Sequence, residues 1–413
     1  MPFNYGPITP YFTLWSILMS KMVETQNDIV AEIHSPIQER SVPEYNILEQ
    51  RFKKLWYLLS TVTHPSKVQA PNEPREIERS LLGRAVRAEL LQKFFALPKS
   101  DTERRKQILD EAHIRDEIAH RYLNQGEISV DLPELGRQTS RLLALEPPES
   151  QTTPETQDKP PIFFIPGISA DIDPVGGLVQ ELAFMGRKIV VIGYPEASLG
   201  KVTPEFARKA AITPNFEPHT TFFKQAIKKL AGEADIELWS YSTGGPIVAE
   251  ILADPEFQER VSNAVFLAPA SCVNQSKLEL ATGLANEIFA FTRKLKKLPS
   301  YSLSSYSLVL GRKTPDLPYQ SKNKATVFTA QIDKVCRKSA SWERMRVKPG
   351  GRIVVWNGED DRLTTSYKLE KDIQNNPQVL SIKDKKGLHV TPVLEPKRIL
   401  RDIFTTQQAQ AAS

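Results

Sequence analysis

From Pro161 onward, short apolar runs alternate with segments of helical periodicity, and this alternation constrains the fold more than any other feature of the chain. Short apolar runs separated by helices are typical of parallel strands that are buried on both faces of a sheet. We therefore expect an α/β fold with a mostly parallel sheet, in which ligands bind at the carboxyl ends of the strands. The expected strands are Ile162–Ile165, Lys188–Ile192, Ile236–Ser240, Ala264–Leu267 and Ile353–Trp356, and the expected helices are about Val175–Phe184, Thr220–Leu230, Gly245–Leu252 and Pro392–Phe404.

The residues before this alternation have a different pattern. Residues 1–124 are polar with apolar residues at helical spacing, which predicts an α-helical N-terminal region whose last helix opens at Ser100. Ile128–Leu132 and Arg141–Leu145 predict an antiparallel pair of strands, and the Pro- and Thr-rich segment 147–160 predicts a loop. We therefore expect a helical region, 1–124, followed by an α/β domain, 125–413.

The composition excludes several classes of protein. Hydrophobic residues make up 40% and charged residues 25%, as in soluble globular proteins, and a net charge of +5 without a known motif does not indicate nucleic-acid binding. Cys272 and Cys336 lie far apart, so we expect neither a disulfide framework nor a zinc site. His113 and His120 share one expected helix but lack a third ligand, so we expect no metal and no cofactor.

The hydropathy pattern predicts no signal peptide and no membrane-spanning helix. The apolar stretch from Tyr11 to Met19 is short, no basic residue precedes it, and no cleavage site of small residues follows it. We therefore expect a cytoplasmic protein, although a non-classical export route would leave no mark in the sequence.

Ser242 lies at the apex of the turn between an expected strand and an expected helix in Ile236–Leu252. Small residues surround it, with Ser240 on the strand side and Gly244 on the helix side. Where a strand and a helix approach closely at a strained serine, the flanking positions have to be small. The pattern therefore favours a nucleophilic serine, while an ordinary turn of Ser, Thr and Gly is the alternative.

Two side chains that could activate this serine follow it along the chain. A serine needs a base to take its proton, and the base needs a group that orients it. Asp361 follows an apolar strand, with Asp360 beside it as a second candidate acid. His389 precedes the last helix, and His219 is its competitor, placed before a helix in the other half of the sheet. Each residue alone fits a solvated loop, but their order along the chain supports a joint role.

The Ser-x-Ser-x-Gly turn at 240–244, together with this order of residues, resembles the α/β-hydrolase superfamily over about residues 125–405. The resemblance implies that Ser242 is the nucleophile, His389 the base and Asp361 the acid. It also implies that the backbone N–H groups of Ile168 and Thr243 form the oxyanion hole.

Two positions depart from the pattern of the superfamily. Ser240 replaces the first glycine of the usual Gly-x-Ser-x-Gly, and Pro166-Gly167-Ile168 replaces the usual His-Gly-x of the oxyanion loop. The role of the glycine is steric and the donors of the hole are backbone groups, so neither change abolishes the expected chemistry. The resemblance implies a serine hydrolase of the esterase or lipase kind, which acts through an acyl-enzyme.

The alternation of strands and helices is interrupted at about 272–349, where the superfamily carries its cap. We expect cap helices at Lys277–Lys297 and Ala325–Met345. Apolar and basic side chains there would suit a lipid-like ester with an anionic head group, or contact with a membrane surface, although a solvated helix face with core aromatics is the commoner explanation. The residues concerned are Phe289, Phe291, Tyr301, Tyr306 and Tyr319, with Arg293, Lys294, Lys296, Lys297, Arg312, Lys313, Lys322 and Lys324 against Asp316.

Other functions remain compatible with the same residues. An acyltransferase or a thioesterase would use the same triad, because only the group that accepts or carries the acyl chain differs. A non-catalytic binding protein with this fold is the alternative from another class, which the altered elbow and the changed oxyanion loop leave open.

Overall fold

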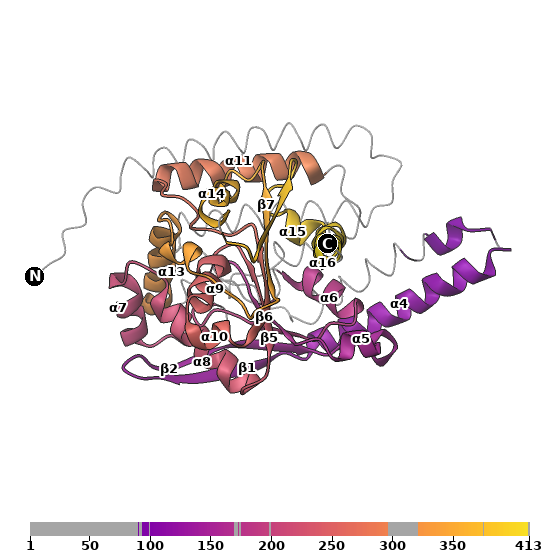
Figure 1. Ribbon diagram of the computed structural model, residues 1–413, viewed down its shortest axis with the longest axis horizontal. Helices are drawn as coiled ribbons and strands as arrows, with labels where there is room; N and C mark the ends of the chain where they lie inside the picture. Colours follow the sequence, from indigo (N-terminus) through magenta and orange to yellow (C-terminus); the bar gives the residue numbers. More distant parts are fainter. Residues whose placement is uncertain are drawn as a thin grey trace, which may run out of the picture. The chain divides into compact units, whose positions relative to one another are not determined.

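The computed structural model describes residues 90–411, apart from 91–92, 99, 169–171, 173–174, 198–199, 296–320 and 375. Its centre is an eight-stranded sheet in the order β1-β2-β4-β3-β5-β6-β7-β8 (Figure 1). β1 and β2 pair antiparallel, β2 pairs antiparallel with β4, and the remaining neighbours are parallel, which confirms the expected mostly parallel sheet. The strands are β1 (Gly126–Leu132), β2 (Gly136–Leu145), β3 (Ile162–Ile165), β4 (Ile189–Ile192), β5 (Ile236–Tyr241), β6 (Val261–Leu267), β7 (Arg352–Gly358) and β8 (Val379–Asp384).

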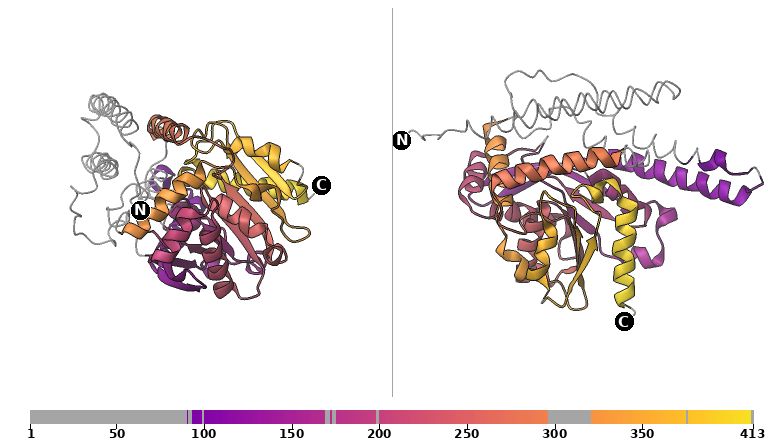
Figure 2. Two further views of the ribbon diagram at one scale, coloured as in Figure 1. Left: turned by 90° about the vertical axis from the view of Figure 1, so that its left-hand side faces the viewer. Right: turned by 90° about the horizontal axis from the view of Figure 1, so that it is seen from above.

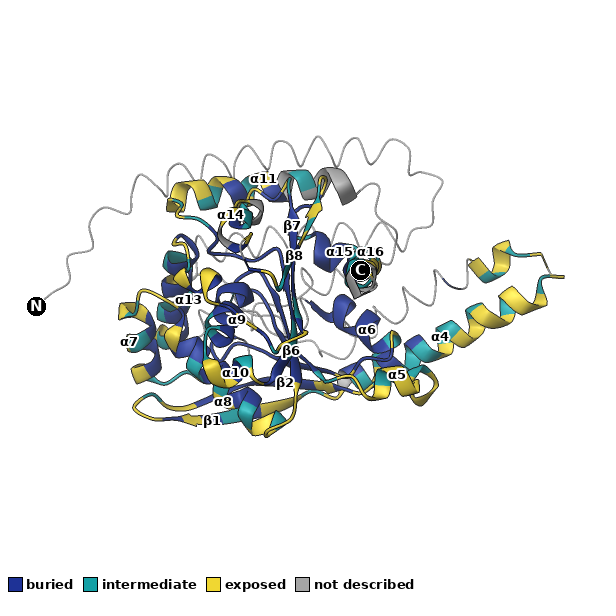
Figure 3. Cartoon of the chain, viewed as in Figure 1, coloured by how far each residue is buried: buried dark blue, intermediate teal, exposed yellow. Residues whose placement is uncertain are grey.

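Helices cover both faces of this sheet, so its central strands are buried (Figure 3). Alternate strand residues point to opposite faces: Leu238 belongs to one apolar core and Trp239 to the other. The helices of the first core are α7 (Pro204–Ile212), α8 (Glu217–Ala231), α9 (Gly244–Leu252), α10 (Pro255–Gln258), α13 (Lys322–Val335) and α14 (Glu370–Ile373). Those of the second are α4 (Thr102–Leu123), α6 (Gly176–Phe184), α15 (Thr391–Leu394) and α16 (Pro396–Ala411).

Three short turns of helix and one very short helix complete the described connections. They are η2 (Glu149–Gln151), η6 (Ala340–Glu343), η7 (Ser366–Leu369) and α5 (Pro154–Gln157). Both η2 and α5 lie within the segment expected to be a loop, and none of their residues is buried.

Several expected elements differ from those observed. β8 and α7 were not expected: only Leu380 is buried in β8, so its apolar signal is weak. The expected helix Pro392–Phe404 is broken before Pro396, because proline disfavours helical backbone in the preceding residue. The second cap helix ends at Val335 instead of Met345, and Ser339 begins η6 by accepting a hydrogen bond from a backbone N–H.

The N-terminal helices expected before residue 90 lie outside the described residues, and so do the cap residues 296–320. α4, the last helix of the expected N-terminal region, begins at a cap on Asp101, not on Ser100. It packs against α6, where Arg115 and Glu181 form a buried ion pair with an N–O distance of 2.7 Å. The domain boundary at 124/125 stays a prediction.

The first helix of the insertion between β6 and β7, α11 (Lys277–Leu295), lies across the carboxyl ends of the strands (Figure 2). An added Cβ on its Gly283 would lie 2.2 Å from the backbone oxygen of Arg362, in the loop after β7. α11 is therefore in direct backbone contact with this loop, which places it beside the site described next.

Candidate active site

Ser242 occupies the sharp turn between β5 and α9 with a φ of 54°, in the left-handed region that a serine rarely adopts. Its N–H donates to the carbonyl of Leu267 at 3.0 Å, which holds the turn to the neighbouring strand. An added Cβ on Gly244 would lie 2.3 Å from the oxygen of Ile165, so the elbow leaves no room for a side chain there. Ser240 is fully buried, and its Oγ donates to the carbonyl of Val265 at 3.5 Å. The fold therefore accommodates a serine where the superfamily has glycine.

Ser242, His389 and Asp361 converge at the carboxyl ends of β5 and β7. His389 Nε2 lies 2.9 Å from Ser242 Oγ, and His389 Nδ1 lies 2.9 Å from Asp361 Oδ2. All three residues are buried. A carboxylate can only accept, so Nδ1 carries the hydrogen in this arrangement and Nε2 accepts from the serine hydroxyl.

The carboxylate of Asp361 is held by four hydrogen bonds. Oδ1 accepts from the backbone N–H groups of Leu363 at 2.9 Å and Thr364 at 3.0 Å, while Oδ2 accepts from the Thr364 hydroxyl at 2.8 Å and from His389. Asp360, the second candidate acid, is exposed and does not contact the histidine. Thr364 was not singled out from the sequence, although its position three residues after an aspartate is typical of such a turn.

Burial and neighbouring charge shift the pKa values of His389 and Asp361 in opposite directions. Burial alone lowers the pKa of His389, but the charge and hydrogen bond of Asp361 and the charge of Glu287 hold that pKa above its ordinary value. Burial likewise raises the pKa of Asp361, but its interactions with His389 and Thr364 hold it below its ordinary value. At neutral pH the arrangement therefore favours an ionised carboxylate beside an imidazole that readily gains a proton.

The loop that carries His389 is held at both backbone polar groups. The Tyr241 hydroxyl donates to the carbonyl of His389 at 3.1 Å. The centroid of the Tyr241 ring lies 5.3 Å from the centroid of the His389 imidazole. The N–H of His389 donates to the Glu287 carboxylate on α11. Neither contact was expected, because the residues lie 148 and 102 positions from His389 and carry no local signal.

The expected oxyanion donors lie on the two segments that flank the serine. An added Cβ on Gly167 would lie 3.3 Å from Ser242 Cβ, so the loop after β3 runs directly beside Ser242. Among the described residues, none accepts a hydrogen bond from the N–H of Ile168 or Thr243. Two unengaged donors next to Ser242 are suited to stabilising negative charge on a bound oxygen.

His219, the competing histidine, lies inside α8 and not ahead of it. It is fully buried, and its Nε2 lies 3.3 Å from the carboxylate of Glu196 and 3.0 Å from the amide of Gln331 on α13. The hydrogen bond to Gln331 therefore joins α8 to α13, and none of the hydrogen bonds of His219 involves Ser242.

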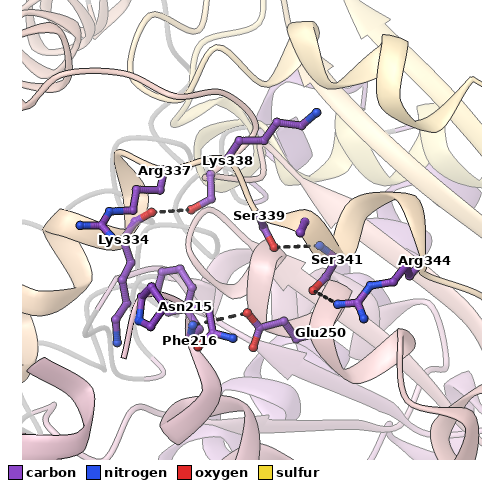
Figure 4. Close-up of a pocket in the computed structure, with 12 residues that line it drawn as sticks. Asn215, Phe216, Glu250, Lys334, Arg337, Lys338, Ser339, Ser341 and Arg344 are labelled. Atoms are coloured by element: carbon purple, nitrogen blue, oxygen red, sulfur yellow. Dashed lines mark hydrogen bonds between the residues drawn. The ribbon is translucent and has the colours of Figure 1, made fainter. Parts of the chain in front are cut away.

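A hollow of about 260 Å³ lies beside α8, α9 and α13, and Glu250 and Lys334 contribute to its lining (Figure 4). Burial lowers the pKa of Lys334 to about 8 and raises that of Glu250. None of Ser242, His389 and Asp361 lines this hollow. In the part of the chain that the structure describes, no group of three or more His, Cys, Asp or Glu side chains could hold a metal ion, and no helix is long and apolar enough to cross a membrane.

No family model and no curated protein matches the chain. Solved structures that resemble it include an esterase from Thermogutta terrifontis, with 12% identity, 69% of this chain and 98% of that chain covered, and a TM-score of 0.48. The esterase EaEST from Exiguobacterium antarcticum has 12% identity, covers 66% and 96%, and has a TM-score of 0.45. The enol-lactonase from Burkholderia xenovorans LB400 has 9% identity, covers 64% and 97%, and has a TM-score of 0.43.

These identities and TM-scores are low, so the fold is assigned from the chain itself. The decisive features are a mostly parallel sheet with an antiparallel pair at one edge, and a serine elbow between a central strand and the following helix. These features are those of the α/β-hydrolase fold.

Proposed function

We propose that the protein is a serine hydrolase that cleaves a carboxylic ester through an acyl-enzyme on Ser242. One observation carries the proposal: Ser242 Oγ, the two ring nitrogens of His389 and the carboxylate of Asp361 form a continuous chain with both hydrogen bonds at 2.9 Å. The positive φ of Ser242 supports it further, because strained backbone at a nucleophile is retained where function requires it.

In this mechanism, Ser242 Oγ attacks the carbonyl carbon of the ester while His389 Nε2 accepts its proton. Asp361 stabilises the imidazolium that forms, and the N–H groups of Ile168 and Thr243 bind the oxyanion. The tetrahedral intermediate expels the alcohol, which takes the proton from His389. Water, deprotonated by His389, then attacks the acyl carbon. The bond from this carbon to Ser242 Oγ breaks, Ser242 takes the proton back from His389, and the acid is released. Each oxyanion donor contributes about 3–4 kcal/mol to such a reaction.

We propose a lipid-like ester as the substrate. Leu278 and Leu284 are exposed on α11, and exposed apolar side chains on a helix beside the site would suit an acyl chain. Of the basic residues named above, Lys322 and Lys324 are the two whose side chains the structure describes; Lys322 is exposed, whereas Lys324 is buried and donates to the carbonyl of Ala197. A membrane-surface role of the basic cap therefore depends on the remaining residues.

A fluorophosphonate probe tests the proposed nucleophile. We expect the folded wild-type protein to be labelled, the Ser242→Ala variant to lose labelling, and the Ser240→Ala variant, which removes a buried hydroxyl two residues away, to keep it. A folded wild-type protein that resists the probe would exclude the hydrolase and leave the binding protein.

Substrate profiling then tests the acyl group and its acceptor. We expect hydrolysis of long-chain esters and binding to anionic vesicles. Cleavage of short uncharged esters alone would contradict the lipid-like substrate, and faster turnover with a thioester, or acyl transfer to an added alcohol, would favour a thioesterase or an acyltransferase.

A further inference from the structure

α11 contacts both loops that carry the partners of Ser242. At Gly283 it lies against the backbone of the loop after Asp361, with no space for a Cβ. One turn later, Glu287 accepts the N–H of His389. Just before α11, the side chain of Gln275 donates to the carbonyl of Leu363 at 3.4 Å. The insertion helix therefore packs directly on the loops that position the acid and the base.

Glu287 is an unusual residue for this contact. Its side chain is buried, with 4% of the residue exposed, and a buried carboxylate costs free energy unless it is bonded or paired. A buried leucine would pack there without that cost. The carboxylate, in contrast, binds the His389 backbone through a charge-assisted hydrogen bond and places a negative charge near the imidazole.

His389 thus interacts with two carboxylates and is held from three segments of the chain. Asp361 holds Nδ1 of the ring, Tyr241 holds the backbone carbonyl from β5, and Glu287 holds the backbone N–H from α11. Because Nε2 has to point at Ser242, a loop anchored at its carbonyl alone could still rotate about that contact. The second anchor removes this freedom.

We propose that Glu287 is a positioning residue for the base, which fixes the His389 loop from α11 and places a second negative charge beside the imidazole. The proposal rests on the hydrolase function proposed above. It makes the insertion helix a part of the machinery that sets the base, in addition to any role in covering the substrate.

Two substitutions separate the charge of Glu287 from its hydrogen bond. Glu287→Gln keeps an accepting oxygen but removes the charge, and Glu287→Leu removes both. Glu279→Gln is the matched control, because it makes the same change on the same helix at an exposed position. The readout is the rate of fluorophosphonate labelling from acidic to alkaline pH, together with kcat and KM on an activated ester.

We expect Glu287→Gln to move the acid limb of the pH profile to lower pH, because removing a nearby negative charge disfavours the protonated imidazole. At alkaline pH its rate should approach that of the wild type. Glu287→Leu should lose on the order of 10- to 100-fold in kcat at every pH, since small displacements of a catalytic group have effects of this size. Glu279→Gln should match the wild type in both respects.

A wild-type pH profile and rate in both Glu287 variants would overturn this inference and leave the hydrolase intact. An unlabelled wild-type protein would overturn the hydrolase itself and the inference with it. If Glu287→Leu fails to fold, the near-isosteric Glu287→Gln still decides the matter through its pH profile.

Discussion

The substitution Asp361→Asn offers a sharp test of the site, because an exposed neighbour, Asp360, provides its own control. In the wild type, Oδ1 accepts two backbone N–H groups at 2.9 and 3.0 Å, and Oδ2 accepts from Thr364 and His389. An asparagine can keep its carbonyl oxygen at the Oδ1 position, so the turn after β7 should persist. Its amide nitrogen would then replace Oδ2 and could no longer accept from the imidazole.

The consequence follows from the tautomer of the histidine. Facing an amide N–H, His389 Nδ1 has to accept, so the ring proton moves to Nε2. That nitrogen lies 2.9 Å from Ser242 Oγ and could no longer take the serine proton. A wrong tautomer of this kind costs on the order of 10⁴-fold in kcat, which corresponds to about 5.5 kcal/mol.

The assay compares wild type, Asp361→Asn and Asp360→Asn by labelling rate, by the burst with an activated ester, and by thermal unfolding. We expect Asp360→Asn to equal the wild type, because its side chain is exposed and does not contact His389. Asp361→Asn should lose activity while remaining folded. Its free energy of unfolding should fall by about 1.5–3 kcal/mol, because hydrogen bonds to the charged carboxylate are replaced by bonds to a neutral amide. Activity of a folded Asp361→Asn within tenfold of the wild type would refute the assigned tautomer, and an equal loss in Asp360→Asn would refute the choice of acid.

Two further outcomes follow from the same geometry. Although burial lowers it, the neighbouring carboxylates hold the pKa of His389 above its ordinary value of 6.5, and the base acts when neutral. The labelling rate should therefore be full above that pKa and fall about tenfold per pH unit below it, and a limb well below 6.5 would contradict the raised pKa. Gly244→Ala should destabilise the fold by about 1–3 kcal/mol in urea unfolding, because its Cβ would meet the oxygen of Ile165 at 2.3 Å. Gly126→Ala is the control, because its added Cβ would have no heavy atom within 4 Å. Equal stabilities of the two variants would contradict a steric role of Gly244.

The expected strands in the centre of the sheet agree closely with the observed ones. The bounds expected for β3, Ile162–Ile165, are those observed. The observed β5 is one residue longer than the expected strand Ile236–Ser240. Every position of these two strands is buried, and all of them except Glu237 in β5 hold an apolar, aromatic or small residue, so the signal is local. β8, at the edge of the sheet, has a mixed burial pattern and was therefore missed.

The sequence by itself determined the class of the fold, the elbow around Ser242 and the short set of residues that could serve as acid and base. These properties depend on the spacing of apolar residues along the sequence and on the size of the residues next to Ser242. Both can be seen in a short stretch of sequence. Only the tertiary structure decided that Asp361 and not Asp360 faces His389, and that Tyr241 and Glu287 hold its backbone. Ser242 and His389 are 147 positions apart, and hydrogen bonds across such separations depend on how the packed elements orient their side chains, which no local pattern records.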